Sequence, residues 1–244
     1  STPKPSSAAS DVYKRQAHTI VKKARLVPSL EYDYNGRLNL SFTVGHERQY
    51  IIRDLSKFFF EMRQGGTVEY GAKLTLTHDI SAFEETARPL VRFFMSRYAD
   101  YMQFAGDAGG YKAGKRSLTL SSSAFDELFG LLVGQKVAMR VDFRNEKHVL
   151  FTDENPVLSL HVEEAGDAFL LSLSELPVFL YMGEKNAYVM LGERLFRCAE
   201  DYTAATREFL RAFTDKGGEL TINRKEMPAF CANVLDAVSY TISE

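Results

Sequence analysis

The stretch LVPSLEYDYNGRLNLSFTV, residues 26–44, decides the fold class of this chain. Alternation of apolar and polar residues is the pattern of a half-buried β-strand. Between two such runs stands Asn35-Gly36, a strong hairpin signal because a type I′ turn needs a positive φ at both central residues. The stretch therefore predicts an antiparallel hairpin. The apolar positions of its two strands are Leu26, Pro28, Leu30 and Tyr32, then Leu38, Leu40, Phe42 and Val44.

Helices are predicted between further strands. Asp54 caps a helix that ends at Gly65-Gly66, where glycine supplies a left-handed cap. A Ser81–Glu84 capping box opens a helix to about residue 104, which Pro89 should kink or restart. The remaining predicted elements are strands at 50–52, 68–70, 73–77 and 117–121, a helix at 125–132, a succession of strands over 135–197, and closing helices at about 203–213 and 226–238, the last with an Asn223–Glu226 capping box. This order predicts an α+β fold, with antiparallel or mixed sheets built from hairpins and about five helices packed on them.

The chain is expected to divide into a leader and two lobes. The Gly-rich segment 106–114 is the one long loop, and we expect an N-terminal α+β lobe at 17–110 to meet a C-terminal α+β lobe at 111–244 near it. Residues 1–16 are expected to be a disordered leader. Residues 6–16, SSAASDVYKRQ, correspond to the translation of a common transposase-based sequencing adapter, which makes this leader non-native and the chain a fragment. The alternative is a natural Ser/Ala-rich leader.

Composition excludes several classes of protein. The chain is 45% hydrophobic and 25% charged with a formal net charge of -2, which is typical of a globular protein and gives no global attraction to nucleic acid. No run reaches the roughly 18 consecutive apolar residues of a membrane-spanning helix. Two cysteines, Cys198 and Cys231, cannot form a disulfide framework, which indicates a reducing compartment and a cytoplasmic protein.

No motif in the sequence indicates catalysis. The segment GGYKAGKR, residues 109–116, resembles a phosphate-binding loop, but Arg116 occupies the position where a Walker A motif needs Ser or Thr. The five histidines stand in separate segments without the close spacing of zinc ligands. We therefore predict no catalytic, cofactor-binding or metal-binding residues in this chain.

One loop could contact nucleic acid. Lys112, Lys115 and Arg116 combine positive charge with glycine, which suits a loop that follows a phosphate backbone. The alternative is an ordinary solvated loop. Basic residues also gather at 22–25 and at 207–211.

The order of the segments resembles the bacterial Swi/Snf-helicase-associated domain over about residues 24–243. Each motif is structural and weakly specific, so their order and spacing carry the resemblance. The residues concerned are Leu26–Leu30, Leu38–Gly45, Tyr50–Leu55, Phe58–Met62, Tyr70–His78, Phe83, Leu118–Leu120, Phe125–Leu132, Leu195–Cys198 and Met227–Phe230.

The resemblance implies a non-catalytic accessory region of a bacterial DNA-dependent ATPase. In that family, ATP and magnesium belong to two helicase lobes, whose Walker motifs have no counterpart here. The implied partners are those lobes in cis and duplex DNA, with no membrane. Two alternatives stay open: a stand-alone protein-interaction module with an open sheet edge, and an enzyme with an unrecognised active site. Helicase motifs in the reading frame beyond Glu244 would favour the accessory-region interpretation over both alternatives.

Overall fold

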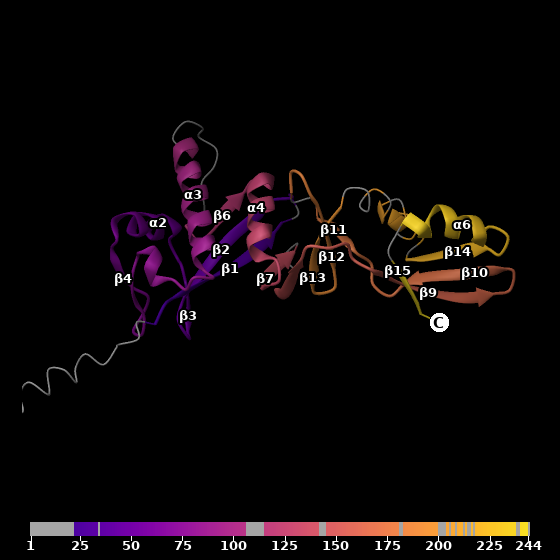
Figure 1. Cartoon of the computed structure of the whole chain (residues 1–244), viewed down its shortest axis with the longest axis horizontal. Helices are drawn as coiled ribbons and strands as arrows, with labels where there is room; N and C mark the ends of the chain where they lie inside the picture. The colour runs from indigo at the N-terminus through magenta and orange to yellow at the C-terminus, as the bar shows by residue number, and fades with distance from the viewer. Residues whose placement is uncertain are drawn as a thin grey trace, which may run out of the picture.

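The computed structural model describes residues 22–33, 35–105, 115–141, 145–180, 183–199, 204, 206–207, 209–211, 213, 216, 218–237 and 240–243. In this part the fold is α+β, as predicted, and the elements follow one another along an elongated molecule (Figure 1). A mixed nine-stranded sheet, a four-stranded sheet and a two-stranded sheet are formed by the described strands. The leader at 1–16 and the loop at 106–114 lie outside the described residues.

The predicted hairpin is confirmed, with a different turn. Strands β1 (Arg25–Tyr32) and β2 (Leu38–Gly45) pair antiparallel over their full length. The Gly36 N–H donates to the Asp33 carbonyl at 2.9 Å and the Asp33 N–H to the Arg37 carbonyl at 3.0 Å. These bonds close a loop one residue longer than a type I′ turn, with Gly36 at φ 73. The Asp33 carboxylate also accepts from the Arg37 N–H at 3.0 Å, which favours the longer loop.

The large sheet grows outward from this hairpin. On one side of β2 lie β3 and β6, and on the far side of β1 the strands follow in the order β7, β8, β13, β12 and β11. Two of the pairings, β1 with β7 and β8 with β13, are parallel. The bounds are β3 (Gln49–Ile51), β6 (Leu118–Leu120), β7 (Lys136–Val141), β8 (Lys147–Thr152), β11 (Val178–Leu180), β12 (Ala187–Leu191) and β13 (Arg194–Cys198).

Three helices cover one face of this sheet (Figure 1): α2 (Leu55–Gln64), α3 (Arg88–Ala105) and α4 (Ser122–Leu132). Their aromatic side chains enter the core edge-on. Phe94 of α3 packs against Phe42 of β2 with ring centroids 5.4 Å apart and against Phe58 of α2 at 5.5 Å. Such T-shaped pairs add about 0.5–1.5 kcal/mol to the gain from burial. These contacts in the core hold α2 and α3 against the sheet.

Both predicted capping boxes are wrong. Asp79, rather than Ser81, caps a 3-10 turn at Ile80–Ala82, and α3 begins only at Arg88. Pro89 lies in the first turn of α3, where a missing N–H costs no helix hydrogen bond. Near the C-terminus, the Asn223 side chain accepts from the Lys225 N–H and therefore does not cap α6 (Met227–Asn233). Pro228 lies in the first turn of α6, where proline is tolerated.

The smaller sheets complete the described structure. Strands β4 (Thr67–Glu69) and β5 (Thr75–Thr77) form the predicted hairpin beside α2. The four-stranded sheet has the order β14-β10-β9-β15, and its parallel β9–β15 pairing was not predicted. The described positions between 204 and 213 are helical, as predicted, and a short 3-10 turn (Leu235–Ala237) follows α6. The bounds are β9 (Leu158–Ala165), β10 (Ala168–Leu173), β14 (Glu219–Asn223) and β15 (Tyr240–Ser243).

Buried side chains form two clusters. The larger one extends from Ala24 to Phe151 and includes Leu180, Tyr188 and Leu195 from the later strands. The smaller one combines residues of the four-stranded sheet and of the C-terminal helices, such as Leu160 and Phe213, with Val189 of β12 and Phe196 and Cys198 of β13. Strands from both sides of segment 106–114 share the large sheet, because β6 pairs with β2 and β7 with β1. The division into lobes at 17–110 and 111–244 stays a prediction. Among the described helices, none combines the length and the apolar character that crossing a membrane requires.

Candidate nucleic-acid interface

The end of the predicted basic loop is held against a helix. Lys112 lies outside the described residues, whereas Lys115 and Arg116 are exposed and end one residue before β6. The Leu55 N–H, at the first residue of α2, donates to the Lys115 carbonyl at 2.8 Å. This bond fixes Lys115 and Arg116 at the N-terminus of α2, where the helix dipole favours negative charge.

The same helix end carries two further cations that sequence reasoning missed. Arg53 and Lys57 are exposed and lie within two residues of Leu55. They stand about sixty positions before the loop, so their proximity to it follows from tertiary structure and not from a local pattern. The predicted cap at Asp54, confirmed by a 2.9 Å bond from the Lys57 N–H to its carboxylate, was the one signal that located this helix end. We call Arg53, Lys57, Lys115 and Arg116 the basic cluster.

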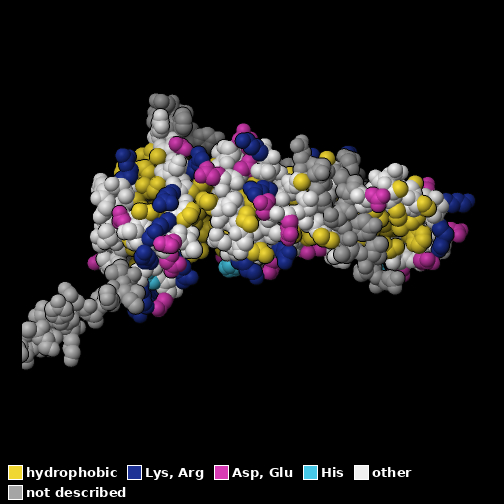
Figure 2. Space-filling view, in the orientation of Figure 1, with side chains coloured by type: hydrophobic (Ala, Val, Ile, Leu, Met, Phe, Trp, Pro, Cys, Tyr) yellow, Lys and Arg dark blue, Asp and Glu magenta, His cyan; other side chains and the backbone are white. Residues whose placement is uncertain are grey.

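The members of the basic cluster have no carboxylate partners within the described residues, whereas several other cations do. Lys22 pairs with Glu47 at 2.6 Å, and Arg37 pairs with Asp33 at 3.0 Å. Across the described ranges, no ion pair involves any member of the basic cluster. Figure 2 shows basic and acidic side chains interspersed over the visible face, which carries no continuous positive surface. The cluster therefore presents four exposed positive charges that no carboxylate neutralises within the described residues.

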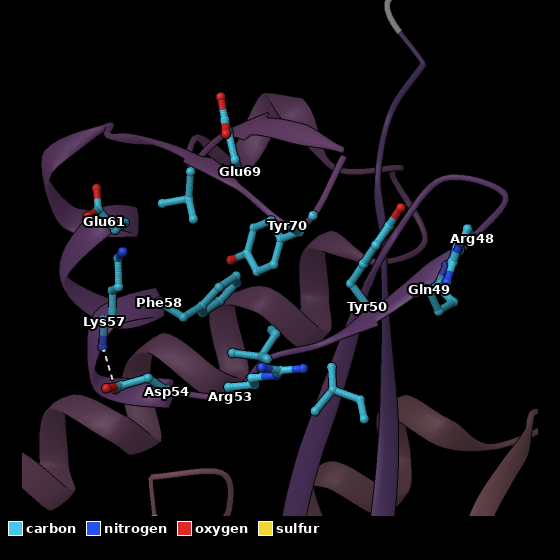
Figure 3. A pocket seen from close by; sticks show the side chains of 14 residues that line it. Arg48, Gln49, Tyr50, Arg53, Asp54, Lys57, Phe58, Glu61, Glu69 and Tyr70 are labelled. Carbon is cyan, nitrogen blue, oxygen red and sulfur yellow. Dashed lines mark hydrogen bonds between the residues drawn. The ribbon is translucent and has the colours of Figure 1, made fainter. Parts of the chain in front are cut away.

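A groove of about 600 Å³ lies beside the basic cluster (Figure 3). Arg53 and Lys57 belong to its lining, and Phe58 of α2 forms part of its floor. One wall comes from β3 and its flanking residues, and the other from the end of β4, including Tyr70. The volume lies within the range typical of ligand sites.

A buried histidine supports the groove from below. The Nε2 atom of His78 lies 2.8 Å from the Tyr70 hydroxyl, and Phe58 meets the imidazole edge-on with centroids 5.2 Å apart. Burial lowers the pKa of His78 and the nearby Lys57 adds to this, against the opposing effects of the Gly66 and Leu76 carbonyls and of Glu61. Burial likewise raises the pKa of Tyr70. His78 and Tyr70 are therefore both uncharged at pH 7, and their role is to pack beneath the groove.

Acid is expected to destabilise the protein through His78. Its pKa in the folded state lies below the unfolded value of about 6.5, so below that pH the unfolded chain binds more protons and stability falls. The slope is at most about 1.4 kcal/mol per pH unit. Urea denaturation of wild type and His78→Gln between pH 7.5 and 5.5 measures the difference. Parallel pH profiles for the two proteins would contradict this assignment.

Other candidate residues from the sequence have structural roles. Arg25 lies 3.9 Å from Glu84 and donates to the His46 carbonyl, so the first basic group is partly neutralised. Cys198 is buried, and burial raises the pKa of its thiol to about 12. Over the residues that the structure describes, no three His, Cys, Asp or Glu side chains are grouped so as to hold a metal ion.

Comparison with known proteins gives one match. The family model described as bacterial SNF2 helicase associated matches residues 116–243, which include Arg116 of the basic cluster and everything from β6 onward. No curated protein matches the chain. No solved structure matches it either. Because the matched segment covers just over half of the chain, this protein belongs to the bacterial SNF2 helicase associated family.

Proposed function

We propose that this chain is a non-catalytic accessory region of a bacterial SNF2-type DNA-dependent ATPase, and that it contacts duplex DNA through the basic cluster. The observation that carries the proposal is the Leu55–Lys115 hydrogen bond, which unites two distant basic segments at one helix N-terminus. Lys and Arg side chains bind phosphate oxygens without reading base sequence, and the contact rests on them because the Leu55 and Lys57 N–H groups are already bonded to Lys115 and Asp54. The proposed contact is therefore electrostatic and independent of DNA sequence.

Removal of two cluster charges is expected to weaken DNA binding and to flatten its salt dependence. Each lost phosphate contact lowers the slope of log K against log salt by about 0.9, so Lys115→Ala/Arg116→Ala should lower it by about 1.8. Fluorescence anisotropy with a labelled 20-base-pair duplex at several salt concentrations measures both quantities. Adding Arg53→Ala and Lys57→Ala should lower the slope by a similar amount again.

A matched control distinguishes loss of the basic cluster from a general reduction in the positive charge of the protein. Lys136 of β7 and Lys147 of β8 are exposed, and Lys136→Ala/Lys147→Ala removes the same two charges elsewhere. The control variant should bind DNA as wild type does. Equal losses in both double variants, or unchanged binding in the cluster variant, would contradict the proposed interface.

The ATPase lobes are the proposed partners in cis, and ATP and magnesium would bind to those lobes. A protein that joins this chain to its SNF2-type motor lobes should hydrolyse ATP with a stronger response to duplex DNA than the lobes without it. Alanine at all four positions of the basic cluster should remove that gain while leaving hydrolysis without DNA unchanged. An equal DNA response with and without the chain would contradict a positioning role.

A further inference from the structure

Strand β3 presents an unpaired backbone edge. The Ile52 N–H donates to the Phe42 carbonyl at 3.0 Å, and Tyr50 stands opposite Val44 in the β2–β3 register. Because backbone groups alternate in direction along an antiparallel strand, the N–H and C=O of Gln49 and Ile51 point away from β2. In the described part of the chain no strand pairs with this edge. Ile51 is 63% exposed, which is unusual for a large apolar residue on a sheet edge.

The opposite wall of the groove has the same property. Bonds from the Tyr70 N–H to the Leu74 carbonyl and from the His78 N–H to the Gly66 carbonyl set the pairing of β4 with β5. The backbone groups of Thr67 and Glu69 therefore point away from β5. Two open strand edges thus border one groove, and β3 and β4 are not paired with each other in the described sheets.

The groove is closed at one end and open at the other. Gly71, at φ +81, lies so close to Tyr50 that a Cβ there would stand 3.1 Å from the Tyr50 ring. Glycine allows the two walls to meet at this end. Figure 3 shows the side chains of Tyr70 and Phe58 within the groove, with Lys57 on α2 and Arg53 between Asp54 and Tyr50. An extended chain beside β3 would direct alternate side chains into the groove, where they would meet the half-buried Tyr70 above the buried Phe58.

Charge at the two ends of the β3 edge indicates the chemistry of the occupant. Arg48 precedes β3 and Arg53 follows it, and neither forms an ion pair within the described residues. Arg48 lies over the Tyr50 ring, 5.5 Å from its centroid. Glu61 of α2 and Glu69 of β4 line the groove on the sides away from β3 and disfavour acidic residues there. The complementary segment has apolar residues at its centre and acidic residues at its ends.

We propose that the β3 edge binds an extended peptide of a protein partner, apolar at its centre and acidic at its ends, as an added strand. Strand addition of this kind takes affinity from backbone hydrogen bonds and specificity from alternate side chains. The occupant is a protein segment rather than nucleic acid, because an open strand edge offers backbone donors and acceptors in strand register. This inference shares Arg53 with the proposed DNA contact, but the backbone edge of β3 has no part in that contact.

The test is selection of random 12-residue peptides displayed on phage against the full 244-residue chain. Ile51→Pro removes the outward N–H without touching the β2–β3 bonds, since proline is tolerated on edge strands where the N–H faces outward. Ile51→Thr retains the N–H and is the matched control. Circular dichroism melting establishes that each variant is folded.

We expect enriched peptides with acidic ends, measured as synthetic peptides by fluorescence polarisation. Ile51→Pro should weaken their binding at least tenfold, Ile51→Thr less than threefold, and Arg48→Glu should select against acidic ends. Three outcomes would overturn the proposal: no peptide is enriched on wild type, a folded Ile51→Pro variant binds them as wild type does, or a 12-nucleotide oligothymidine displaces them while binding equally to Ile51→Pro. If the proline variant does not fold, peptides methylated at single backbone nitrogens replace it, and unchanged binding at every methylated position is then the contradicting result.

Discussion

Replacing Asp126 by alanine is expected to lower the free energy of unfolding by about 3 kcal/mol. The Asp126 carboxylate on α4 accepts four hydrogen bonds from one segment: from the N–H groups of Glu184 at 3.0 Å and Lys185 at 2.9 Å, from the Asn186 amide at 3.1 Å and from the Tyr188 hydroxyl at 2.6 Å. Tyr188 is 1% exposed, so alanine would leave a buried hydroxyl without an acceptor. Urea denaturation at pH 7 measures the loss.

The pH dependence of stability and a second variant, Asp126→Asn, assign the loss of stability to the carboxylate. Burial raises the pKa of Asp126, but the bonds from Tyr188, Lys185, Asn186 and Glu184 outweigh it, and the net pKa is lowered. Its contribution is therefore complete above the unfolded pKa of about 3.9 and is lost as pH falls through the folded value. Asp126→Asn, which keeps the size and one acceptor oxygen, should lose less stability than alanine. A loss below about 0.5 kcal/mol for alanine, the range of ordinary surface substitutions, would contradict this role.

Local elements could be predicted because their signals are local. The alternation around Asn35-Gly36 predicts the β1–β2 hairpin, and Asp54 with Gly65 predicts both ends of α2, where the helix indeed has its cap bond and its left-handed residue. These signals reside within about ten residues and do not depend on the rest of the chain. Strand order is different, since the parallel pairing of β1 with β7 joins residues about a hundred positions apart.

The wrong predictions arise where two local signals compete. Asp79 and Ser81 both suit a cap, and the Asp79 side chain accepts the Ser81 N–H at 2.8 Å, which leaves Ser81 inside a 3-10 turn. Asp33 similarly competes with Asn35-Gly36 by bonding backbone N–H groups two and four residues onward. Short polar side chains offer the backbone several alternatives of similar energy, so sequence spacing does not decide among them.

Two of the four residues of the basic cluster could be predicted from the sequence. Lys115 and Arg116 stand in a visibly basic, glycine-rich segment, whereas Arg53 and Lys57 flank an ordinary helix cap. The Lys115 carbonyl that joins them accepts from Leu55, a backbone contact that no side-chain pattern encodes. The groove was not predicted at all, because its walls come from two hairpins whose approach to each other is set by tertiary packing.

Phe129→Ala is expected to cost about 4 kcal/mol, the largest loss among the substitutions considered. Phe129 of α4 is fully buried and packs against Phe151 of β8 at 5.1 Å and Tyr188 of β12 at 4.8 Å between centroids. The Arg197 guanidinium lies 5.2 Å from the ring centroid. Truncation would open a cavity where α4 meets three strands of the large sheet. Urea denaturation followed by far-ultraviolet circular dichroism measures the change.

Two control variants test whether the loss of stability comes from the buried volume of Phe129 or from the removal of any aromatic ring. Phe129→Leu should cost clearly less than alanine, because it retains most of the buried volume. Phe60→Ala removes the same atoms from a ring that is 44% exposed and should cost about 1 kcal/mol or less. Because Asp126 and Phe129 share Tyr188 as a neighbour, the double alanine variant should lose less stability than the sum of the single losses. Strict additivity would mean that the hydrogen bonds from segment 184–188 and the aromatic packing hold α4 to the sheet independently.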